Sequence, residues 1–199
     1  TSLADMLNKM DNYGEVIGGF VCLSHGLAGE EKYVNSWRSN KKMCPKGVFE
    51  IITIHVIDLI RIFNKNVYLS SNNLMNLSKN GDAPDTSNST LKFANNAEIT
   101  VLASYFAPYN FEWHIVFEDG IFKANEKKIE ILGPRKTFDH NNSFCKPKII
   151  EALDINRNID YENSLLKSIV FFMNHATKNK KFDKYLSDVS LESNLSILK

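Results

Sequence analysis

The chain has 199 residues, of which 43% are hydrophobic and 24% are charged, and its formal net charge is +1. This length suffices for one sizeable core or two small ones, and the composition is typical of a globular domain. A near-neutral charge gives no general attraction for nucleic acid, and the apolar stretches are interrupted before they could span a bilayer. We therefore expect no nucleic-acid or membrane partner.

The three cysteines Cys22, Cys44 and Cys145 show no metal-ligand spacing. Their odd number favours reduced thiols. The sequence begins at Thr1 and lacks the basic and apolar segments of a secretory signal. These features predict a cytoplasmic protein.

The N-terminal part is predicted to contain a helix, a strand and a long loop. Apolar residues at helical spacing follow Ser2, a good N-cap, and Gly14 is suited to end the helix. Residues 15–24 are predicted as a strand in which Gly18-Gly19 marks a bulge or a close backbone approach. Residues 25–47 are predicted as a loop, and loops of this length are often functional.

An apolar helix is predicted over residues 48–63, after Pro45 and Gly47. His55 and Asp58 interrupt its apolar run and, three residues apart, share a face. Burying an imidazole and a carboxylate costs several kcal/mol unless each finds a partner. We expect the two side chains to be paired or to line a cleft; the alternative is a pair of core residues satisfied by neighbouring backbone.

Beyond residue 66 the sequence predicts a run of strands followed by helices. Alternating apolar residues and turn signals predict strands over residues 67–77, 85–93, 98–106, 111–117, 120–124 and 126–132. Helices are predicted over residues 161–177 and 183–198. The fold class is therefore α+β, with an open, mostly antiparallel sheet of about six strands and helices packed on one face.

The order of residues between 37 and 63 resembles a known family. Trp37-Arg38, a spacer, Gly47, His55 and Asp58-Leu59 are similar to the C-terminal substrate domain of the glucose–fructose oxidoreductase/inositol dehydrogenase (Gfo/Idh/MocA) family. In that family a Trp-Arg pair precedes a Gly-rich entry to a helix that carries Asp-x-x-x-His-x-x-Asp-Leu. The sequence departs from this pattern at the first aspartate, where it has Ile51.

The resemblance implies NAD(P)-dependent hydride transfer at a hydroxyl or keto carbon of a sugar, sugar nucleotide or cyclitol. His55 would be the catalytic residue that exchanges a proton with the reacting oxygen. The residues implied to orient a sugar-like substrate are Trp37, Arg38, Lys46, Asp58 and His25. The segment from Pro45 to Glu50 is most similar to members that act in surface-polysaccharide pathways.

Family enzymes also carry a Rossmann domain with a Glu-Lys-Pro motif, and this sequence contains neither Gly-x-Gly-x-x-Gly nor Glu-Lys-Pro. We therefore expect residues 1–199 to form a single substrate-binding and oligomerisation domain, with NAD or NADP bound mainly by a domain outside the chain. Apolar residues of the predicted strands are expected to make the open sheet face a homo-oligomer interface: Ile99, Val101, Ala103, Tyr105, Trp113, Ile115 and Phe117.

Two other functions remain open, and two are disfavoured. Because Ile51 replaces the aspartate, the domain could be a non-catalytic ligand-binding or regulatory derivative, or it could be purely structural. A serine hydrolase is disfavoured because no Gly-x-Ser-x-Gly elbow is present. A metal site is disfavoured because the five histidines show no ligand spacing.

Overall fold

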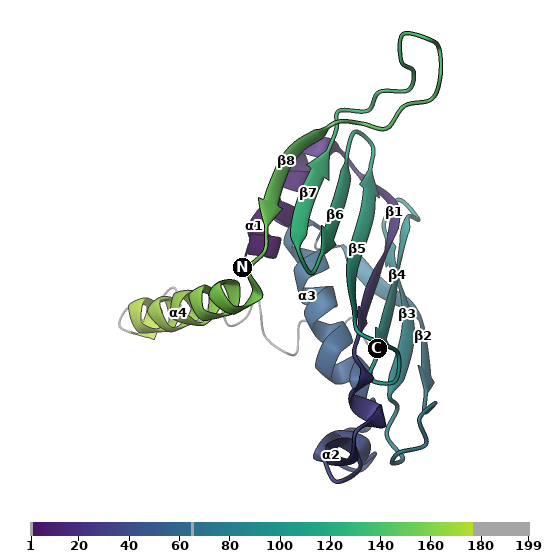
Figure 1. The fold of residues 1–199 in the computed structure, drawn as a ribbon, viewed down its shortest axis with the longest axis vertical. Coiled ribbons are helices and arrows are strands. Elements are labelled where there is room, and N and C mark those ends of the chain that lie inside the picture. Colours follow the sequence, from purple (N-terminus) through teal and green to yellow (C-terminus); the bar gives the residue numbers. More distant parts are fainter. Residues whose placement is uncertain (1, 65, 177–199) are drawn as a thin grey trace.

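The computed structural model describes residues 2–64 and 66–176 and contains one sheet that carries helices on one face (Figure 1). The strands are β1 (Val16–Ser24), β2 (Val67–Met75), β3 (Thr86–Phe93), β4 (Glu98–Ser104), β5 (Asn110–Phe117), β6 (Ile121–Asn125), β7 (Lys128–Leu132) and β8 (Ile149–Asp154). The longer helices are α1 (Ser2–Asn8), α3 (Ile54–Phe63) and α4 (Arg157–Ala176). The predicted α+β class with an open sheet is confirmed.

The sheet order is β2-β3-β4-β1-β5-β6-β7-β8. β1 pairs in parallel with β4 and antiparallel with β5, and the other described pairs are antiparallel. Gly19 of β1 lies so close to β5 that an added Cβ would be 2.4 Å from the carbonyl oxygen of His114. The close backbone approach predicted at this glycine pair is confirmed, because only a residue without a side chain fits there.

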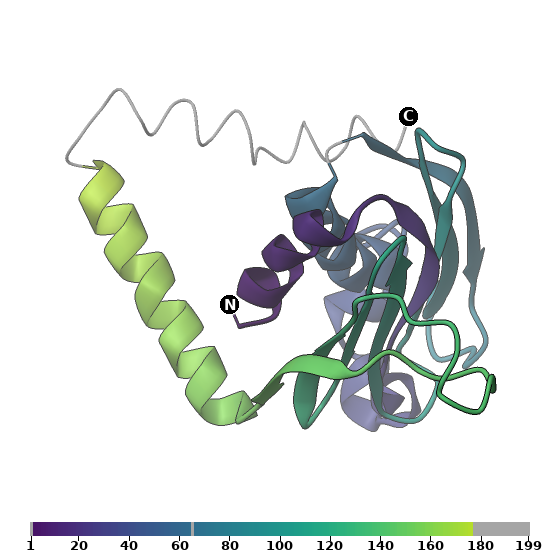
Figure 2. The same cartoon turned by 90° about the horizontal axis from the view of Figure 1, so that it is seen from above.

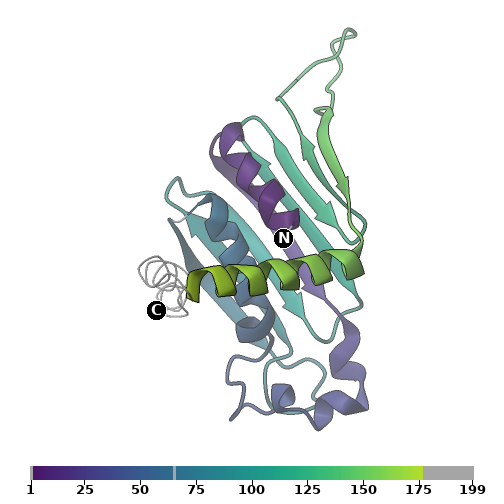
Figure 3. The ribbon, with the colours of Figure 1, turned by 90° about the vertical axis from the view of Figure 1, so that its left-hand side faces the viewer.

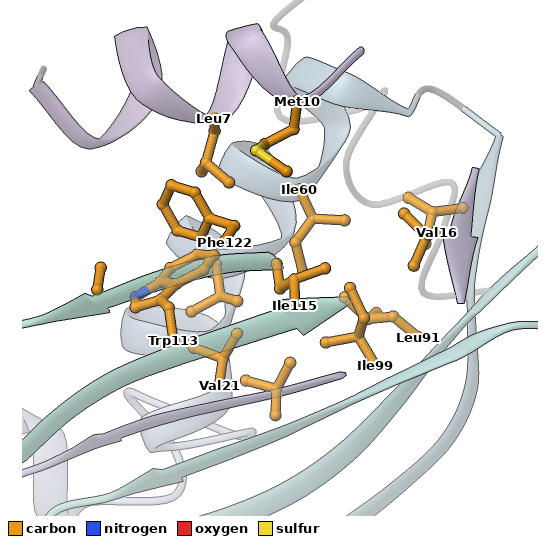
Figure 4. Packing of buried hydrophobic residues seen from close by; sticks show 14 of the residues in the cluster. Leu7, Met10, Val16, Val21, Ile60, Leu91, Ile99, Trp113, Ile115 and Phe122 are labelled. Atoms are coloured by element: carbon orange, nitrogen blue, oxygen red, sulfur yellow. The ribbon is translucent and has the colours of Figure 1, made fainter. Parts of the chain in front are cut away.

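The main core lies between the sheet and the helices α1 and α3 (Figure 4). Leu7 of α1 and Ile57 and Ile60 of α3 are fully buried against inward-facing strand residues such as Trp113 and Phe122. Alternation along the strands and helical spacing along α1 and α3 place these side chains on facing surfaces. The helix that begins at Ser2 continues as a 3₁₀ turn over Lys9–Tyr13 and ends before Gly14.

The residues expected on the open face of the sheet lie instead on the covered face. Those residues of β4 and β5, with Tyr105 directly after β4, are at most 4% exposed: Ile99, Val101, Ala103, Tyr105, Trp113, Ile115 and Phe117. The assignment of these seven residues to the open face was wrong because alternation identifies one face of a strand but not which side the helices cover. Among the residues that alternate with them, His114 stacks on Phe20 at 5.7 Å between ring centroids.

The predicted loop 25–47 is a compact series of short turns. It contains η2 (Gly26–Gly29), α2 (Glu31–Val34) and η3 (Trp37–Ser39). Ala28 and Tyr33 of this segment build a second, smaller core with Val48, Ala103 and Tyr105. Leu27, Ile51 and Ile52 are packed against this core. The segment is therefore packed into the fold through buried side chains.

The C-terminal part differs from the prediction at two places. The sheet has a further edge strand, β8, in a segment for which no strand was predicted. The predicted helix over 161–177 is confirmed as α4, which extends away from the sheet on its helical side (Figures 1, 2 and 3). The helix predicted over 183–198 lies outside the described residues. Among the residues described, none of the helices combines the length and apolarity needed to cross a membrane.

Candidate functional site

The helix that carries His55 begins at a glycine that no other residue could easily replace. Gly47 has φ +55°, and an added Cβ would be 1.8 Å from the carbonyl oxygen of Pro84. That same oxygen accepts a hydrogen bond of 3.0 Å from the Val48 N–H. This close contact holds the start of the helix against Pro84 and Asp85, which directly precede β3.

A π-helical turn, η4 (Phe49–Thr53), follows Gly47 and leads into α3. The buried hydroxyls of Thr53 and Ser87 lie 3.0 Å apart and join this turn to β3. Isolated π-turns widen a helix locally and occur often at functional sites. The turn sets the rotation of α3 and hence the direction of its polar side chains.

His55 and Asp58 lie on the exposed face of α3, while Val56, Ile57 and Ile60 are buried on its other side. The alternative that His55 and Asp58 are core residues satisfied by neighbouring backbone is wrong, because both are exposed. Apolar residues occur all round this helix, and Ile62 is itself 39% exposed, so the apolar pattern did not identify the covered side. His55 is exposed, and among residues 2–64 and 66–176 its imidazole has no hydrogen-bond partner.

A second group of predicted residues meets near the end of β1. The Arg38 guanidinium lies 4.7 Å from the centroid of the Trp37 ring, a cation–π distance. His25 contacts the Tyr105 ring at 4.9 Å between centroids. Burial lowers the pKa of His25, and the charge of Arg38 lowers it further, so the imidazole is held neutral. Burial raises the pKa of Tyr105 to about 12, so its phenol stays protonated.

The structure therefore brings His25, Trp37 and Arg38 together but leaves Lys46 apart. The Lys46 backbone N–H donates to the Glu50 carboxylate at 3.1 Å, and its residue is exposed. Trp37 also lines a shallow groove of about 450 Å³ between residues 34–43 and 81–82, and His55 is not among the residues that line it.

Sequence analysis missed several buried polar residues around this group. The Asp85 carboxylate accepts hydrogen bonds from the N–H groups of Leu77 at 3.1 Å and Ser78 at 2.7 Å. Asp85 follows Pro84 in a turn cluster, a pattern that indicates an exposed residue, and no local signal reveals its burial. Burial raises the pKa of the Cys44 thiol to about 12, which argues against a nucleophilic role. The described residues contain no His, Cys, Asp or Glu cluster suited to a metal ion.

Comparison with solved structures gives the same fold in several dehydrogenases. A levoglucosan dehydrogenase in complex with NADH and levoglucosan superposes with a TM-score of 0.61 at 17% identity, over 77% of this chain and 43% of that one. An inositol dehydrogenase homologue complexed with NAD⁺ from Azotobacter vinelandii gives a TM-score of 0.57 at 11% identity, over 78% and 41%. The chain thus spans less than half the length of these proteins.

The sequence itself matches one family model over more than half of its length. The model describes the GFO/IDH/MocA C-terminal domain and covers residues 12–123. No curated protein sequence matches the chain. The matched segment contains β1, the Trp37-Arg38 pair, α3 and the strands β2 to β5. The chain therefore belongs to the GFO/IDH/MocA family, whose C-terminal domain it contains.

Proposed function

We propose that this chain is the substrate-side domain of an NAD(P)-dependent oxidoreductase that acts on a sugar, sugar nucleotide or cyclitol. Within this proposal the enzyme is cytoplasmic and serves a surface-polysaccharide pathway. The observation that carries the proposal is the exposed imidazole of His55 on α3, in a chain of this family. A proton-exchanging group must be reachable by substrate, and His55 is.

The chain's own residues do not suit a dinucleotide. The sequence has no glycine-rich phosphate-binding turn, and the described sheet has only one parallel strand pair. A nucleotide-binding domain outside these 199 residues would hold NAD or NADP, which supplies hydride acceptance or donation when bound.

His55 would handle the proton at the substrate oxygen. Its neutral imidazole accepts the hydroxyl proton during oxidation, and the imidazolium returns a proton during reduction. Asp58 lies on the same face one turn later and would accept a hydrogen bond from the substrate. Trp37, Arg38 and His25 would present a ring, a fixed positive charge and a neutral imidazole to other parts of it, and Lys46 a mobile charge.

One observation favours a second function, a non-catalytic ligand-binding or regulatory derivative. Ile51 takes the place of the family's aspartate and packs against the cluster that contains Tyr33 and Tyr105. An isoleucine can neither orient an imidazole nor relay a proton.

The test uses the chain together with its nucleotide-binding domain, with NAD⁺ and NADP⁺ and a panel of sugars, sugar nucleotides and cyclitols. His55→Asn should lower kcat by roughly 10²–10⁴-fold, the usual contribution of general acid–base catalysis. Its melting temperature should not change, because His55 is exposed. His140→Asn, at an exposed position far along the chain from α3, is the matched control.

Two outcomes would reject catalysis. One is an unchanged kcat for His55→Asn, and the other is the absence of any dinucleotide-binding unit encoded with this chain. Ile51→Asp then separates the alternatives. It should raise kcat in an enzyme that works below its full efficiency, and it should leave turnover at background in a binding derivative.

A further inference from the structure

A hairpin between β7 and β8 projects beyond the end of the sheet (Figures 1 and 3). Residues 135–148 form this projection, the finger. The Cys145 N–H donates to the Thr137 carbonyl oxygen at 3.2 Å. Closer to the tip, the Asp139 N–H donates to the Ser143 carbonyl oxygen at 3.0 Å. The two arms of the finger are therefore joined by backbone hydrogen bonds of their own.

Two phenylalanines lie opposite each other on the arms of the finger. Phe138 and Phe144 form an antiparallel bridge, and their rings stack at 5.2 Å between centroids. Phe138 is 49% exposed and Phe144 is 86% exposed, and neither belongs to a buried cluster of the fold. Two adjacent aromatic rings held in solvent contribute little to the stability of the chain itself. This arrangement indicates a surface that another molecule covers.

The finger is basic, whereas the rest of the chain is slightly acidic. It contains four exposed basic residues: Arg135, Lys136, Lys146 and Lys148. Asp139 is its one acidic residue, so the finger carries +3 and the remaining residues carry −2 of the net charge of +1. Among the residues that the structure describes, none forms an ion pair with the four basic side chains. The Asp119 carboxylate, which accepts the Arg135 N–H at 2.7 Å, offsets part of this charge at the base of the finger. The surface therefore suits an anionic partner.

The size of the aromatic surface favours a lipid bilayer over a protein partner. A phenylalanine presents roughly 200 Å², so the exposed fractions of the two rings leave roughly 250 Å². A specific protein interface buries about 800 Å² on each partner, about three times as much. A bilayer needs less apolar contact, because each basic residue beside anionic headgroups strengthens binding about fivefold.

A single-stranded nucleic acid fits the finger less well than a bilayer does. Nucleic-acid sites hold bases by stacking them on free aromatic faces. The rings of Phe138 and Phe144 stack on each other, so one face of each ring is already covered. Contact with hydrocarbon needs no free ring face, since it depends only on the apolar area that leaves water.

We propose that the finger docks the domain on the surface of a bilayer that contains anionic lipids. The turn between the two rings, residues 139–143, is polar, so the finger lies along the surface and does not enter it end on. Phe138 and Phe144 contact the boundary between headgroups and acyl chains, and the basic side chains contact the anionic headgroups. The projection of the finger lets it reach a flat surface ahead of the sheet and the helices (Figure 1).

This proposal revises the expectation of no membrane partner, which rested on the net charge and on the lack of a spanning segment. A local cluster of charge attracts a surface even when the whole chain is nearly neutral. The proposal is independent of the catalytic proposal, because it concerns a different part of the molecule.

Cosedimentation of the 199-residue chain with lipid vesicles tests the proposal. The chain should bind vesicles of phosphatidylcholine mixed with phosphatidylserine, bind vesicles of phosphatidylcholine alone much more weakly, and be released by added NaCl. Lys146→Gln with Lys148→Gln should weaken the binding about 25-fold, since each basic residue contributes about fivefold. Lys32→Gln with Lys127→Gln, two exposed lysines outside the finger, is the matched control and should bind as the wild type does.

The aromatic contact is tested with Phe138→Ser and Phe144→Ser together. This variant should bind anionic vesicles about tenfold more weakly or worse, with unchanged circular dichroism, because neither ring belongs to the core. A polarity-sensitive dye locates the contact. With Cys22→Ser, the dye labels Cys145 and not the buried Cys44, and its emission should shift to shorter wavelength on anionic vesicles.

Three outcomes would overturn the proposal. The first is a chain that does not sediment with anionic vesicles, and the second is binding that neither double substitution in the finger weakens. The third is a chain that binds a single-stranded oligonucleotide but no vesicles, which would identify nucleic acid as the partner. His55→Asn should bind vesicles as the wild type does, so this test succeeds or fails independently of catalysis.

Discussion

Replacing Gly47 with alanine tests how tightly the start of the site helix is held. The backbone there has φ +55°, a conformation that costs an ordinary residue about 1–2 kcal/mol. The new Cβ would also lie 1.8 Å from the Pro84 carbonyl oxygen, so one of the two backbone segments must move. Such a movement would break the 3.0 Å hydrogen bond from Val48 to Pro84, worth about 1 kcal/mol.

The two costs add to about 2–3 kcal/mol of unfolding free energy. For a domain of this size 1 kcal/mol shifts the melting temperature by about 2–4 °C, so Gly47→Ala should lower it by about 4–12 °C. Gly26→Ala is the matched control, because no atom lies within 4 Å of its added Cβ. Thermal and urea unfolding of both variants measure the difference. Equal stabilities for Gly47→Ala and Gly26→Ala would show that the close approach to Pro84 does not exist.

Three further predictions concern protonation, a buried hydrogen bond and cofactor binding. Burial lowers the pKa of His25, so the unfolded chain binds a proton at this residue more readily than the folded chain. The contribution of the neutral His25 to the free energy of unfolding should be complete above about pH 6.5. It should be lost as the pH falls through the folded pKa. Melting curves from pH 7.5 to 5 should show this fall, and His25→Gln should weaken it whereas His140→Gln should not. Thr53→Val leaves the buried Ser87 hydroxyl without its partner at 3.0 Å and should lower the free energy of unfolding by about 1–3 kcal/mol. Thr53→Ser keeps a hydroxyl at this position and should lower it less. Equal losses for the two variants in urea unfolding would contradict this prediction. The 199-residue chain alone should not bind NADH or NADPH with micromolar affinity, and calorimetric titration that found such affinity would show a dinucleotide site on this domain.

The sequence predicted the central strands well because their alternation is strong and their turns carry Asn, Asp or Gly. β5 and β6, joined around Glu118-Asp119-Gly120, are an example. β8 was missed because it is a short edge strand that follows the irregular 133–148 segment, and most of its residues are exposed. Its position depends on pairing with β7, a contact between residues more than 15 apart that no local pattern reveals.

The sequence proposed which residues form the candidate site, but it could not predict how they are arranged. The resemblance identified Trp37 and Arg38, and the structure places the cation over the ring. Helical spacing correctly put His55 and Asp58 on one face, but it could not tell that the face is exposed. Burial of the Tyr33 and Asp85 side chains depends on how the 25–47 segment folds over the ends of the strands. That packing is tertiary and leaves no periodic signal.

Ile51 lies four residues before His55 and is packed against the second, smaller core. It contacts the cluster built around Tyr33 and Tyr105, and Tyr105 in turn contacts His25. A side chain at this position therefore connects the helix that carries His55 with the end of β1 that carries His25. An isoleucine connects them by apolar packing, which holds the helix in place but gives His55 no charged neighbour.

This distinction explains why position 51 separates the two proposed functions. A ligand-binding derivative needs only the rigid arrangement that apolar packing supplies. An enzyme also needs the imidazole held in one tautomer and orientation, and a carboxylate does this by accepting a hydrogen bond. A carboxylate partly buried against this cluster carries a desolvation cost that isoleucine avoids. Isoleucine at position 51 thus avoids the desolvation cost but cannot orient His55 for proton transfer. The effect of Ile51→Asp must therefore be measured as a change in kcat and not only as a change in stability.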